Sequence, residues 1–468
     1  MRKLLKSHVI IIMYLAFGQL IAQNNYEEDL NAKSQTDVSP LFFYPNELGL
    51  PLIQPSNFNH DAEYNLRDGL PNFFSKLASD ENVKIGYLGG SITRSDEQYR
   101  VQSIDFIQSM FPDVKITGIN AGVSGTGTDL GACRLYHQLL KHNPDLIFLE
   151  FAVNGAFAKG MEGIIRQIWK YNPEIDICLI YTISSGLSQF YAEGKVPKNI
   201  LKLDQLAEHY AIPSIHMGIE ASYLEKQGKL VWKGDPEIIK NKIVFSRDGI
   251  HPLKSGGNLY AESIARAFVQ LKKNSSAQEH SLPEPLYSDN WEDAKMFNPM
   301  QIGFFEGEWK KINPSNIDNI NQFAQWFSYI MKSEKPGSSF SFQFEGNMFG
   351  IFDIGGPEVG QLEIELDGNP LHLKQVGRDN FIATNDTSRL LFINRFNRYC
   401  NNRYRGQVFF IDIPDGKHNV KITLSNQKAD KASILGKGQQ TDINEHPEKY
   451  NRTVEYLGKI LIRGEIIE

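Results

Sequence analysis

Residues 83–94 read Val-Lys-Ile-Gly-Tyr-Leu-Gly-Gly-Ser-Ile-Thr-Arg, an apolar run that ends in two glycines and a serine. The run has the composition of a strand that enters a buried sheet. Gly89 and Gly90 permit a sharp turn because neither carries a Cβ atom. Ser91 is therefore predicted to lie at the carboxyl end of a strand, the edge where open α/β sheets bind their ligands. Taken alone, a Gly-Gly-Ser sequence is more often an ordinary cap or turn.

The region around this stretch alternates between strand-like and helix-like segments. Further strands are expected at 114–118, 146–151 and 175–181, and the segments between them carry apolar residues at helical spacing. Nearly continuous apolar strands separated by helices predict a parallel sheet that is covered on both faces. We therefore expect a three-layer α/β domain over residues 66–270, preceded by an irregular segment over residues 24–65.

A different pattern begins after residue 270. Residues 271–299 contain a polar stretch with two prolines and are expected to form a linker. Beyond residue 300, apolar and polar residues alternate in short runs at 339–344, 361–366, 408–413 and 419–424, with turn sequences beside several of them. This alternation predicts an antiparallel β-sandwich over residues 300–468.

The first 23 residues combine a basic head with a short apolar stretch at 9–17 and a plausible cleavage point after Gln23. This pattern predicts a signal peptide over residues 1–23, and hence export to the periplasm or beyond, with an uncleaved anchor as the alternative. No later segment reaches 18 uninterrupted apolar residues, so we expect no stable membrane insertion. The net charge of −6 offers no electrostatic attraction to nucleic acid. Three cysteines without metal-ligand spacing are predicted to be free, buried thiols.

A serine hydroxyl becomes a nucleophile only beside a base that removes its proton and donors that stabilise the resulting oxyanion. Asp248 and His251 are three residues apart, which on one helical turn would place both side chains on the same face. The carboxylate could then orient the imidazole, as in a Ser-His-Asp triad. Because the chain has 11 histidines, this pair alone is weak support.

Two further segments supply hydrogen-bond donors. The glycine-rich stretch 120–129 follows the second expected strand, and 151–154 follows the third and ends in Asn154. Both should open onto the same sheet edge as Ser91. The backbone N–H of Gly125 and the side-chain amide of Asn154 are the candidate donors, although each alone is more often a turn or a cap.

The four segments together resemble the SGNH (GDSL-like) hydrolases, whose blocks supply Ser, Gly, Asn and His in this order. The resemblance covers residues 83–265 and implies a flavodoxin-like parallel sheet. It places the nucleophile on Ser91, the base on His251 and the orienting carboxylate on Asp248. It also implies an oxyanion hole formed by the backbone N–H groups of Ser91 and Gly125 and by the Asn154 side chain. No metal and no organic cofactor are implied.

Two departures from the family pattern stand out. The nucleophile block reads Gly-Gly-Ser-Ile-Thr rather than Gly-Asp-Ser-Leu, a variant associated with secreted carbohydrate esterases. The third block has Gly155 where many members carry aspartate, which leaves the asparagine in place.

The architecture resembles bacterial esterases that remove acetyl groups from plant or algal polysaccharides. We therefore expect an acylated glycan as substrate and acetyl as the acyl group. One alternative is a methylesterase acting on a uronic-acid polymer such as pectin, for which Arg94 or the basic run 395–405 could bind carboxylates. A lower alternative is a non-catalytic glycan-binding protein. Whether the β-sandwich binds glycan or supports the fold is open, as is the oligomeric state.

Overall fold

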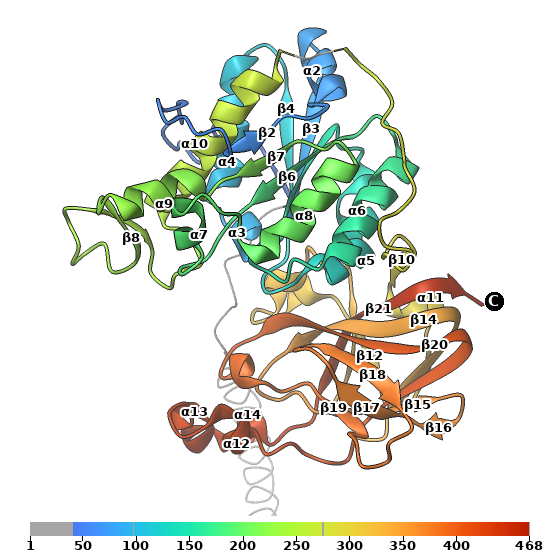
Figure 1. Ribbon diagram of the computed structural model, residues 1–468. Coiled ribbons are helices and arrows are strands. Elements are labelled where there is room, and N and C mark those ends of the chain that lie inside the picture. The colour runs from blue at the N-terminus through green and yellow to red at the C-terminus, as the bar shows by residue number, and fades with distance from the viewer. Residues whose placement is uncertain (1–40, 97, 274–275, 468) are drawn as a thin grey trace, which may run out of the picture. The chain divides into compact units, whose positions relative to one another are not determined.

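The computed structural model describes residues 41–96, 98–273 and 276–467. The predicted signal peptide at 1–23 lies outside the described residues. Within the described chain, two compact units are present. The first comprises residues 41–296 and 461–464 and is called the α/β unit; the second comprises 297–460 and 465–467 and is called the sandwich unit (Figure 1).

The α/β unit is built on a seven-stranded sheet with the order β1-β4-β3-β5-β6-β7-β2. Its five central strands are parallel, and in chain order they run 2-1-3-4-5, which is the flavodoxin-like order. The short strands β1 and β2 pair antiparallel at the two edges. The strands are β1 (Phe42–Phe43), β2 (Tyr64–Asn65), β3 (Val83–Gly89), β4 (Ile116–Gly122), β5 (Leu146–Glu150), β6 (Asp176–Tyr181) and β7 (Ser214–His216). The predicted fold class is confirmed.

Helices cover both faces of this sheet (Figure 1). Helix α6 packs against α5 and α8 on one face, and α4 packs against α10 on the other. Every residue of β5 and β6 is buried, as expected for strands covered on both faces. The remaining elements are α2 (Pro71–Ala78), α3 (Ser91–Arg94), α4 (Tyr99–Met110), α5 (Thr128–Gln138), η1 (Leu140–His142), α6 (Ala158–Tyr171), α7 (Ser188–Ala192), α8 (Lys198–His209), α9 (Ile219–Lys226), β8 (Leu230–Lys233), β9 (Ile243–Ser246) and α10 (Lys254–Leu271).

The second central strand runs further than the sequence pattern predicted. We expected a strand over 114–118, whereas β4 extends to Gly122 and pairs in register with β3 up to Gly89. Its last residues are small because the chain passes close to α3: a Cβ atom on Gly122 would collide with the backbone of Arg94. An Asn-Ala-Gly sequence typical of a loop is therefore part of the sheet.

Residues 276–293, within the stretch expected to be a linker, pack along the α/β unit. His280 Nε2 lies 2.7 Å from Oδ1 of the buried Asp176. The backbone N–H groups of Leu286 and Tyr287 donate to the carboxylate of Glu162, at 2.6 and 2.8 Å. These polar residues therefore satisfy buried groups of the α/β unit.

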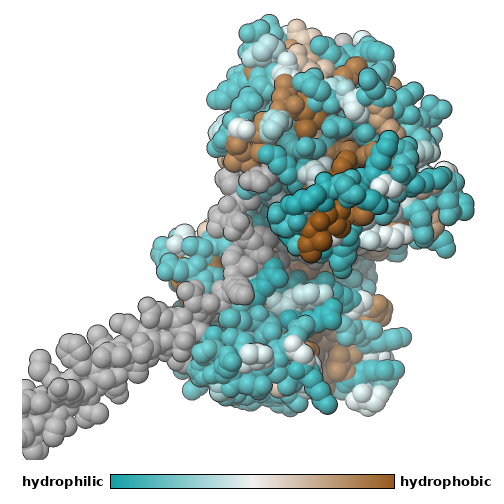
Figure 2. Space-filling model, turned by 90° about the vertical axis from the view of Figure 1, so that its left-hand side faces the viewer, coloured by the Kyte–Doolittle hydropathy of each residue, from teal (hydrophilic) through white to brown (hydrophobic). Residues whose placement is uncertain are grey.

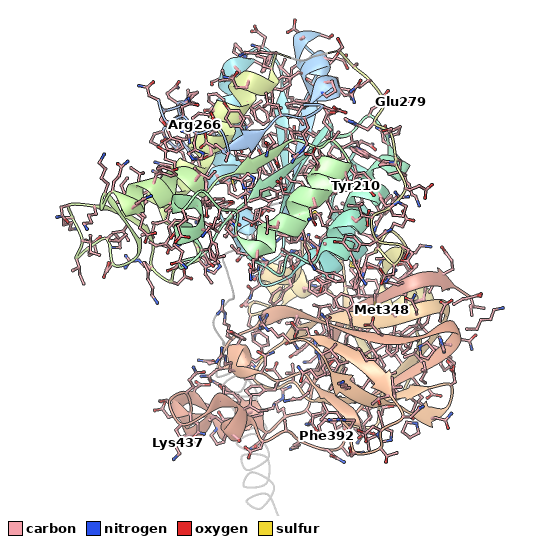
Figure 3. The ribbon with its side chains drawn as sticks, in the orientation of Figure 1. Tyr210, Arg266, Glu279, Met348, Phe392 and Lys437 are labelled. Carbon is pink, nitrogen blue, oxygen red and sulfur yellow. The ribbon has the colours of Figure 1, made fainter. Side chains whose placement is uncertain are left out.

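A buried ion-pair network ties the N-terminal segment to two helices. Arg266 on α10, labelled in Figure 3, donates to both carboxylate oxygens of Glu63 at 2.6 and 2.8 Å. It also donates to Glu220 on α9 at 2.7 Å. The side chains of Arg266 and Glu63 are almost completely buried. Removing one partner of such a network leaves an uncompensated buried charge.

The sandwich unit is a strand-rich, mostly antiparallel body (Figure 1). Its centre is the long pair β14–β20, which stays in register from 339 to 355 apart from a shift between Gly346 and Met348. Strand β18 pairs parallel to β20. Strands β10 (Ala294–Phe297) and β21 (Glu455–Ile466) have residues assigned to each of the two units. The other elements are α11 (Pro299–Ile302), β11 (Phe304–Glu306), β12 (Lys310–Ile312), η2 (Pro314–Asn316), η3 (Asn321–Phe323), β13 (Ile330–Ser333), β14 (Ser339–Gly355), β15 (Gln361–Leu366), β16 (Asn369–Pro370), β17 (His372–Gln375), β18 (Asn380–Thr384), β19 (Phe392–Asn394), η4 (Arg398–Cys400), β20 (Arg405–Leu424), α12 (Lys431–Leu435), α13 (Thr441–Glu445) and α14 (Pro447–Tyr450).

The burial along β14 explains the alternation in the sequence. In its first half Phe340, Phe342 and Phe344 are buried, while Gln343 and Glu345 between and beside them are exposed. From Met348 onward every residue is buried, so the second half is covered on both faces. The alternating half reads clearly as a strand from sequence, and the continuous half forms the core.

Two predictions from composition bear on the described residues. Cys133, Cys178 and Cys400 are free and buried, which confirms the prediction, and burial raises the pKa of the Cys400 thiol to about 11. None of the helices within the described ranges has the length and apolarity needed to span a bilayer.

Figure 2 shows that the face in view is mostly hydrophilic, with scattered apolar patches.

The first prediction concerns the buried network. Replacing Arg266 by methionine should destabilise the protein by about 3–5 kcal/mol, because Glu63 and Glu220 lose their buried counter-charge. The matched change Lys240→Met removes an exposed pair with Glu237 and should cost at most about 1 kcal/mol. Thermal and urea midpoints of both variants provide the measurement. Equal midpoints would show that the network contributes no more than a surface pair.

Candidate active site

The turn after β3 presents Ser91 as the sequence predicted. β3 ends at Gly89, Gly90 precedes the four-residue helix α3, and Ser91 is the first residue of that helix. The Ser91 hydroxyl lies 2.7 Å from Nε2 of His251, 160 residues further along the chain. The fold therefore brings the candidate nucleophile and the candidate base into hydrogen-bond contact.

His251 in turn contacts Asp248, with 2.6 Å between Nδ1 and Oδ2. An ionised carboxylate only accepts hydrogen bonds, so Nδ1 carries the proton and Nε2 is free to accept one from Ser91. Burial alone would raise the pKa of Asp248, but hydrogen bonds from the His251 ring and from the backbone of Ile250 and His251 hold it below its usual value. Asp248 is therefore ionised at neutral pH. The imidazole is 48% exposed, which leaves it accessible to a substrate.

The pair is built differently from the sequence argument. We expected Asp248 and His251 to share one turn of helix, whereas the segment is a bend between β9 and α10. Asp248 Oδ1 accepts the backbone N–H groups of Ile250 and His251, both at 2.9 Å, and this folds the chain back on itself. Gly249 adopts a φ of +94°, a conformation that favours glycine. One carboxylate thus shapes the loop with one oxygen and orients the imidazole with the other.

The three loops at this sheet edge pack closely on one another. A Cβ atom on Gly90 would lie 2.5 Å from Oδ1 of Asn154, and one on Gly127 would lie 2.8 Å from the Asn154 carbonyl oxygen. The N–H of Val123 donates to the carbonyl of Gly89 at 3.0 Å. The second and third sequence blocks therefore contact each other, and both contact the Ser91 turn.

The two glycines of these loops occupy left-handed backbone positions. Gly125 lies in the turn after β4 with a φ of +74°, and Gly155 follows Asn154 with a φ of +69°. Such angles favour glycine over most side chains. The glycine at 155, where many SGNH hydrolases carry aspartate, is thus explained by its left-handed backbone conformation. Among the described residues, the buried Oδ1 of Asn154 has no hydrogen-bond partner.

Glu150 is a site residue that the sequence argument missed. It ends β5 in register with Gly89 and is completely buried. Its carboxylate accepts hydrogen bonds from Thr93 at 2.9 Å, from Thr182 at 2.5 Å and from the backbone N–H of Gly90. Burial raises the pKa of Glu150, and these three donors and the charge of protonated His251 oppose that shift. An acidic residue at the end of an otherwise apolar buried strand was the available signal.

Arg134 supports the same turn from α5. Its side chain is completely buried and donates to the carbonyl oxygen of Gly89 at 2.9 Å and to that of Ala121. Burial lowers the pKa of Arg134 to about 9. The ends of β3 and β4 are thus held by one guanidinium.

Arg94, considered above for a substrate carboxylate, has an interior side chain. It is 1% exposed, and burial lowers its pKa to about 10. A cation at that depth does not face a polymer at the surface. Its proposed contact with substrate stays a prediction that its burial does not favour. Among the residues described, no group of three His, Cys, Asp or Glu side chains is arranged to hold a metal ion.

The close approach at Gly90 generates a second prediction. Gly90→Ala should push the Asn154 side chain away and lower kcat for p-nitrophenyl acetate by roughly 10²–10³, the usual effect of losing one oxyanion donor. Gly438→Ala, at a position with open space around it, is the control and should leave kcat unchanged. Wild-type kcat in Gly90→Ala would show that Asn154 is not needed in its observed place.

Glu150 generates a third prediction, with Glu162 as a matched buried control. Each Glu→Gln change leaves a buried donor poorly paired, so both should cost about 1–3 kcal/mol of stability. Only Glu150→Gln should also lower kcat/KM for p-nitrophenyl acetate, because Glu150 accepts the backbone N–H of Gly90 in the turn that carries Ser91. Stability is read from urea unfolding, and kcat/KM is measured for both variants. An equal kcat/KM in the two variants would reduce Glu150 to a structural role.

The chain is similar to known esterases in part of its sequence and in its fold. No family model matches the sequence. An arylesterase from Vibrio mimicus is 25% identical over 213 residues, which cover 42% of this chain and 94% of that protein. An acetylxylan esterase structure from Geobacillus stearothermophilus, Axe2, matches 42% of this chain and 97% of its own, with 17% identity and a TM-score of 0.32.

Two structures match both units of the chain. A two-domain esterase active on acetylated mannans, named CEX, is 18% identical and covers 86% of this chain and 100% of its own, with a TM-score of 0.63. The structure of the same enzyme crystallised with mannopentaose has a TM-score of 0.62 to this chain. At this identity the likeness establishes the fold. In fold, the chain is similar to this two-domain esterase.

Proposed function

We propose that this protein is a serine esterase that removes acyl groups, acetyl above all, from a polysaccharide or oligosaccharide. The observation that carries the proposal is the continuous hydrogen-bonded chain from the Ser91 hydroxyl through His251 to Asp248. A serine at the edge of an α/β sheet, with a base and an orienting carboxylate in contact, has the arrangement needed for nucleophilic catalysis.

The first half of the reaction forms an acyl-enzyme. His251 Nε2 takes the Ser91 proton while Oγ attacks the ester carbonyl, and the imidazolium is stabilised by Asp248. The backbone N–H groups of Ser91 and Gly125 and the Asn154 side chain stabilise the oxyanion. The contacts that join these loops support this assignment. The C–O bond to the sugar then breaks, and His251 returns its proton to the departing sugar oxygen.

The second half releases the acid. A water molecule gives a proton to His251 and attacks the acyl carbonyl, and the same donors hold the second oxyanion. Collapse of that intermediate releases acetate, and the proton on His251 returns to Ser91. Every proton is carried by His251, so the scheme needs no metal and no organic cofactor.

The substrate class rests on likeness and on the predicted export. The CEX enzyme acts on acetylated mannans and the Axe2 enzyme is an acetylxylan esterase, so an acetylated plant or algal glycan is the first candidate. Removal of methyl esters from a uronic-acid polymer is the second candidate, favoured by the arginines of residues 395–405. A non-catalytic glycan-binding role is disfavoured, because it gives no reason for the bonded triad. Export follows from the signal peptide predicted at 1–23.

The fourth prediction tests this proposal. Ser91→Ala should lower turnover of p-nitrophenyl acetate by roughly 10⁴-fold or more without unfolding the protein. Ser95→Ala, at the carboxyl end of the same short helix, is the control and should retain activity. Acetylated mannan, acetylated xylan and methylated pectin are tested side by side. The wild-type protein should release acetate from an acetylated glycan and should release no methanol from the pectin. Activity that survives in Ser91→Ala would contradict the nucleophile, and methanol release would favour the second candidate.

A further inference from the structure

Arginines gather in the sandwich unit on the chain between β19 and β20. Residues 395–405 contain four of them, and a fifth comes from the turn between β17 and β18: Arg395, Arg398, Arg403, Arg405 and Arg378. Arg395 is neutralised inside the sandwich by a two-point ion pair with the buried Asp353, at 2.6 and 2.7 Å. Arg378, Arg398 and Arg405 instead lie together around one aromatic ring.

Three of these arginines surround one tyrosine. The guanidinium carbons of Arg378, Arg398 and Arg405 lie 4.8, 5.1 and 5.2 Å from the centre of the Tyr399 ring. Arg398 also donates to the Tyr399 hydroxyl at 3.2 Å. This hydrogen bond and the charges of the three guanidinium groups lower the pKa of Tyr399. A place that favours a phenolate favours any other anion as well. We call Arg378, Arg398, Tyr399 and Arg405 the arginine–tyrosine cluster.

Arg405 is the member that points most directly to a ligand. It is only 6% exposed, and within the described residues its Nε atom is buried without a hydrogen-bond partner. Burial lowers the pKa of Arg405. Cys400 and Asp379 oppose this shift, whereas the charges of Arg378 and Arg403 add to it. A buried cation is costly unless it is paired. The Nε atom of Arg405 is therefore a buried donor on a cation, and no carboxylate of the described chain accepts a hydrogen bond from it.

The acidic side chain beside the cluster is too weakly placed to supply that anion. Arg378 Nε lies 3.8 Å from Asp379, and both side chains are more than one-third exposed. An exposed pair at this distance contributes little, because water screens it. The cluster therefore keeps a net positive charge.

The loop that carries the cluster is anchored before any ligand binds. Asn397 accepts the backbone N–H of Tyr399 and donates to Gln407, both at 3.0 Å. The N–H of Asn402 donates to the Tyr450 hydroxyl at 3.0 Å. Tyr399 itself remains 41% exposed. The guanidinium groups of Arg378 and Arg398 are exposed and already lie beside Tyr399. Groups placed in this way lose little entropy on binding a planar or tetrahedral anion.

We propose that the arginine–tyrosine cluster is a binding site for the anionic groups of an acidic glycan, either uronate carboxylates or sulfate esters. The glycan, as opposed to another anion, rests on the proposed function. The net charge of −6 for the whole chain disfavours a nucleic acid as the partner. The sandwich unit would thus select glycans that carry acidic sugars, while the α/β unit removes their acyl groups.

The fifth prediction uses the full chain with Ser91→Ala, so that substrate is bound and not consumed. Polygalacturonate, a sulfated galactan and neutral galactomannan serve as probes, and Kd is measured by calorimetry at two salt concentrations. The exposed arginines are replaced in Arg378→Gln/Arg398→Gln, and Arg389→Gln, an exposed arginine outside the cluster, is the control. The double variant should bind at least one acidic polymer about 10-fold or more weakly, and the control should not.

The outcomes separate the possibilities. Loss of polygalacturonate binding identifies carboxylates as the ligand, and loss of sulfated galactan binding identifies sulfate. Affinity should fall with salt, since the contact is ionic. Unchanged affinity in the double variant, absence of binding to both acidic polymers, or tighter binding to a DNA duplex would overturn the proposal. Hydrolysis of p-nitrophenyl acetate by the double variant with Ser91 restored is measured separately, so failure of the esterase proposal is distinguishable.

Discussion

The close approach of Gly90 to the Asn154 side chain is the constraint on which the site depends. The serine turn leaves β3, a central strand flanked by β4 and β5, so the loops after all three strands meet at one edge. At that edge a Cβ atom on Gly90 would occupy space that Asn154 holds. Gly90 thus does more than permit a turn, because the absence of its Cβ atom leaves room for the Asn154 side chain beside Ser91.

Two buried side chains, Glu150 and Arg134, form hydrogen bonds with the backbone of this turn. The N–H of Gly90 donates to the carboxylate of Glu150, and the carbonyl of Gly89 accepts from the guanidinium of Arg134. Hydrogen bonds with an ionised partner are roughly twice as strong as neutral ones. These two hydrogen bonds fix the single peptide group between Gly89 and Gly90, directly before Ser91 and the four-residue helix α3. Rigid placement of the nucleophile is what lowers the cost of reaching the transition state.

In the loop that carries His251, one residue, Asp248, fixes both the backbone and the side chain. Asp248 shapes the bend through Oδ1 and orients His251 through Oδ2, so orientation and loop geometry are set by one carboxylate. In the sandwich unit, by contrast, the buried Nε atom of Arg405 has no hydrogen-bond partner among the described residues, and the guanidinium lies over the ring of the exposed Tyr399. The position of that buried cation beside an exposed ring is what distinguishes it as a candidate for binding a ligand.

Much of the fold could be predicted from sequence, as could the residues that meet in the contacts Ser91–His251 and His251–Asp248, because their signals are local. Apolar runs that end in glycine, serine or asparagine identified the strands and the loops after them, and the four blocks identified Ser91, Asn154 and His251. The missed features depend on contacts distant in sequence. Glu150 and Arg134 gain their roles from Gly90 and Gly89, and the burial of Arg94 depends on how β4 passes α3. Likewise, residues 276–293 looked like a polar linker because their partners, such as Asp176 and Glu162, lie more than 100 positions away.

The central claim is that Ser91 is a nucleophile activated by His251, and covalent labelling tests it most directly. The full chain is treated with a fluorophosphonate, and the modified residue is located by peptide mass spectrometry while the rate is followed with time. The account predicts one adduct, on Ser91, and a rate that falls by at least about 10²-fold in His251→Ala. An adduct on another residue, or an equal rate in His251→Ala, would contradict it.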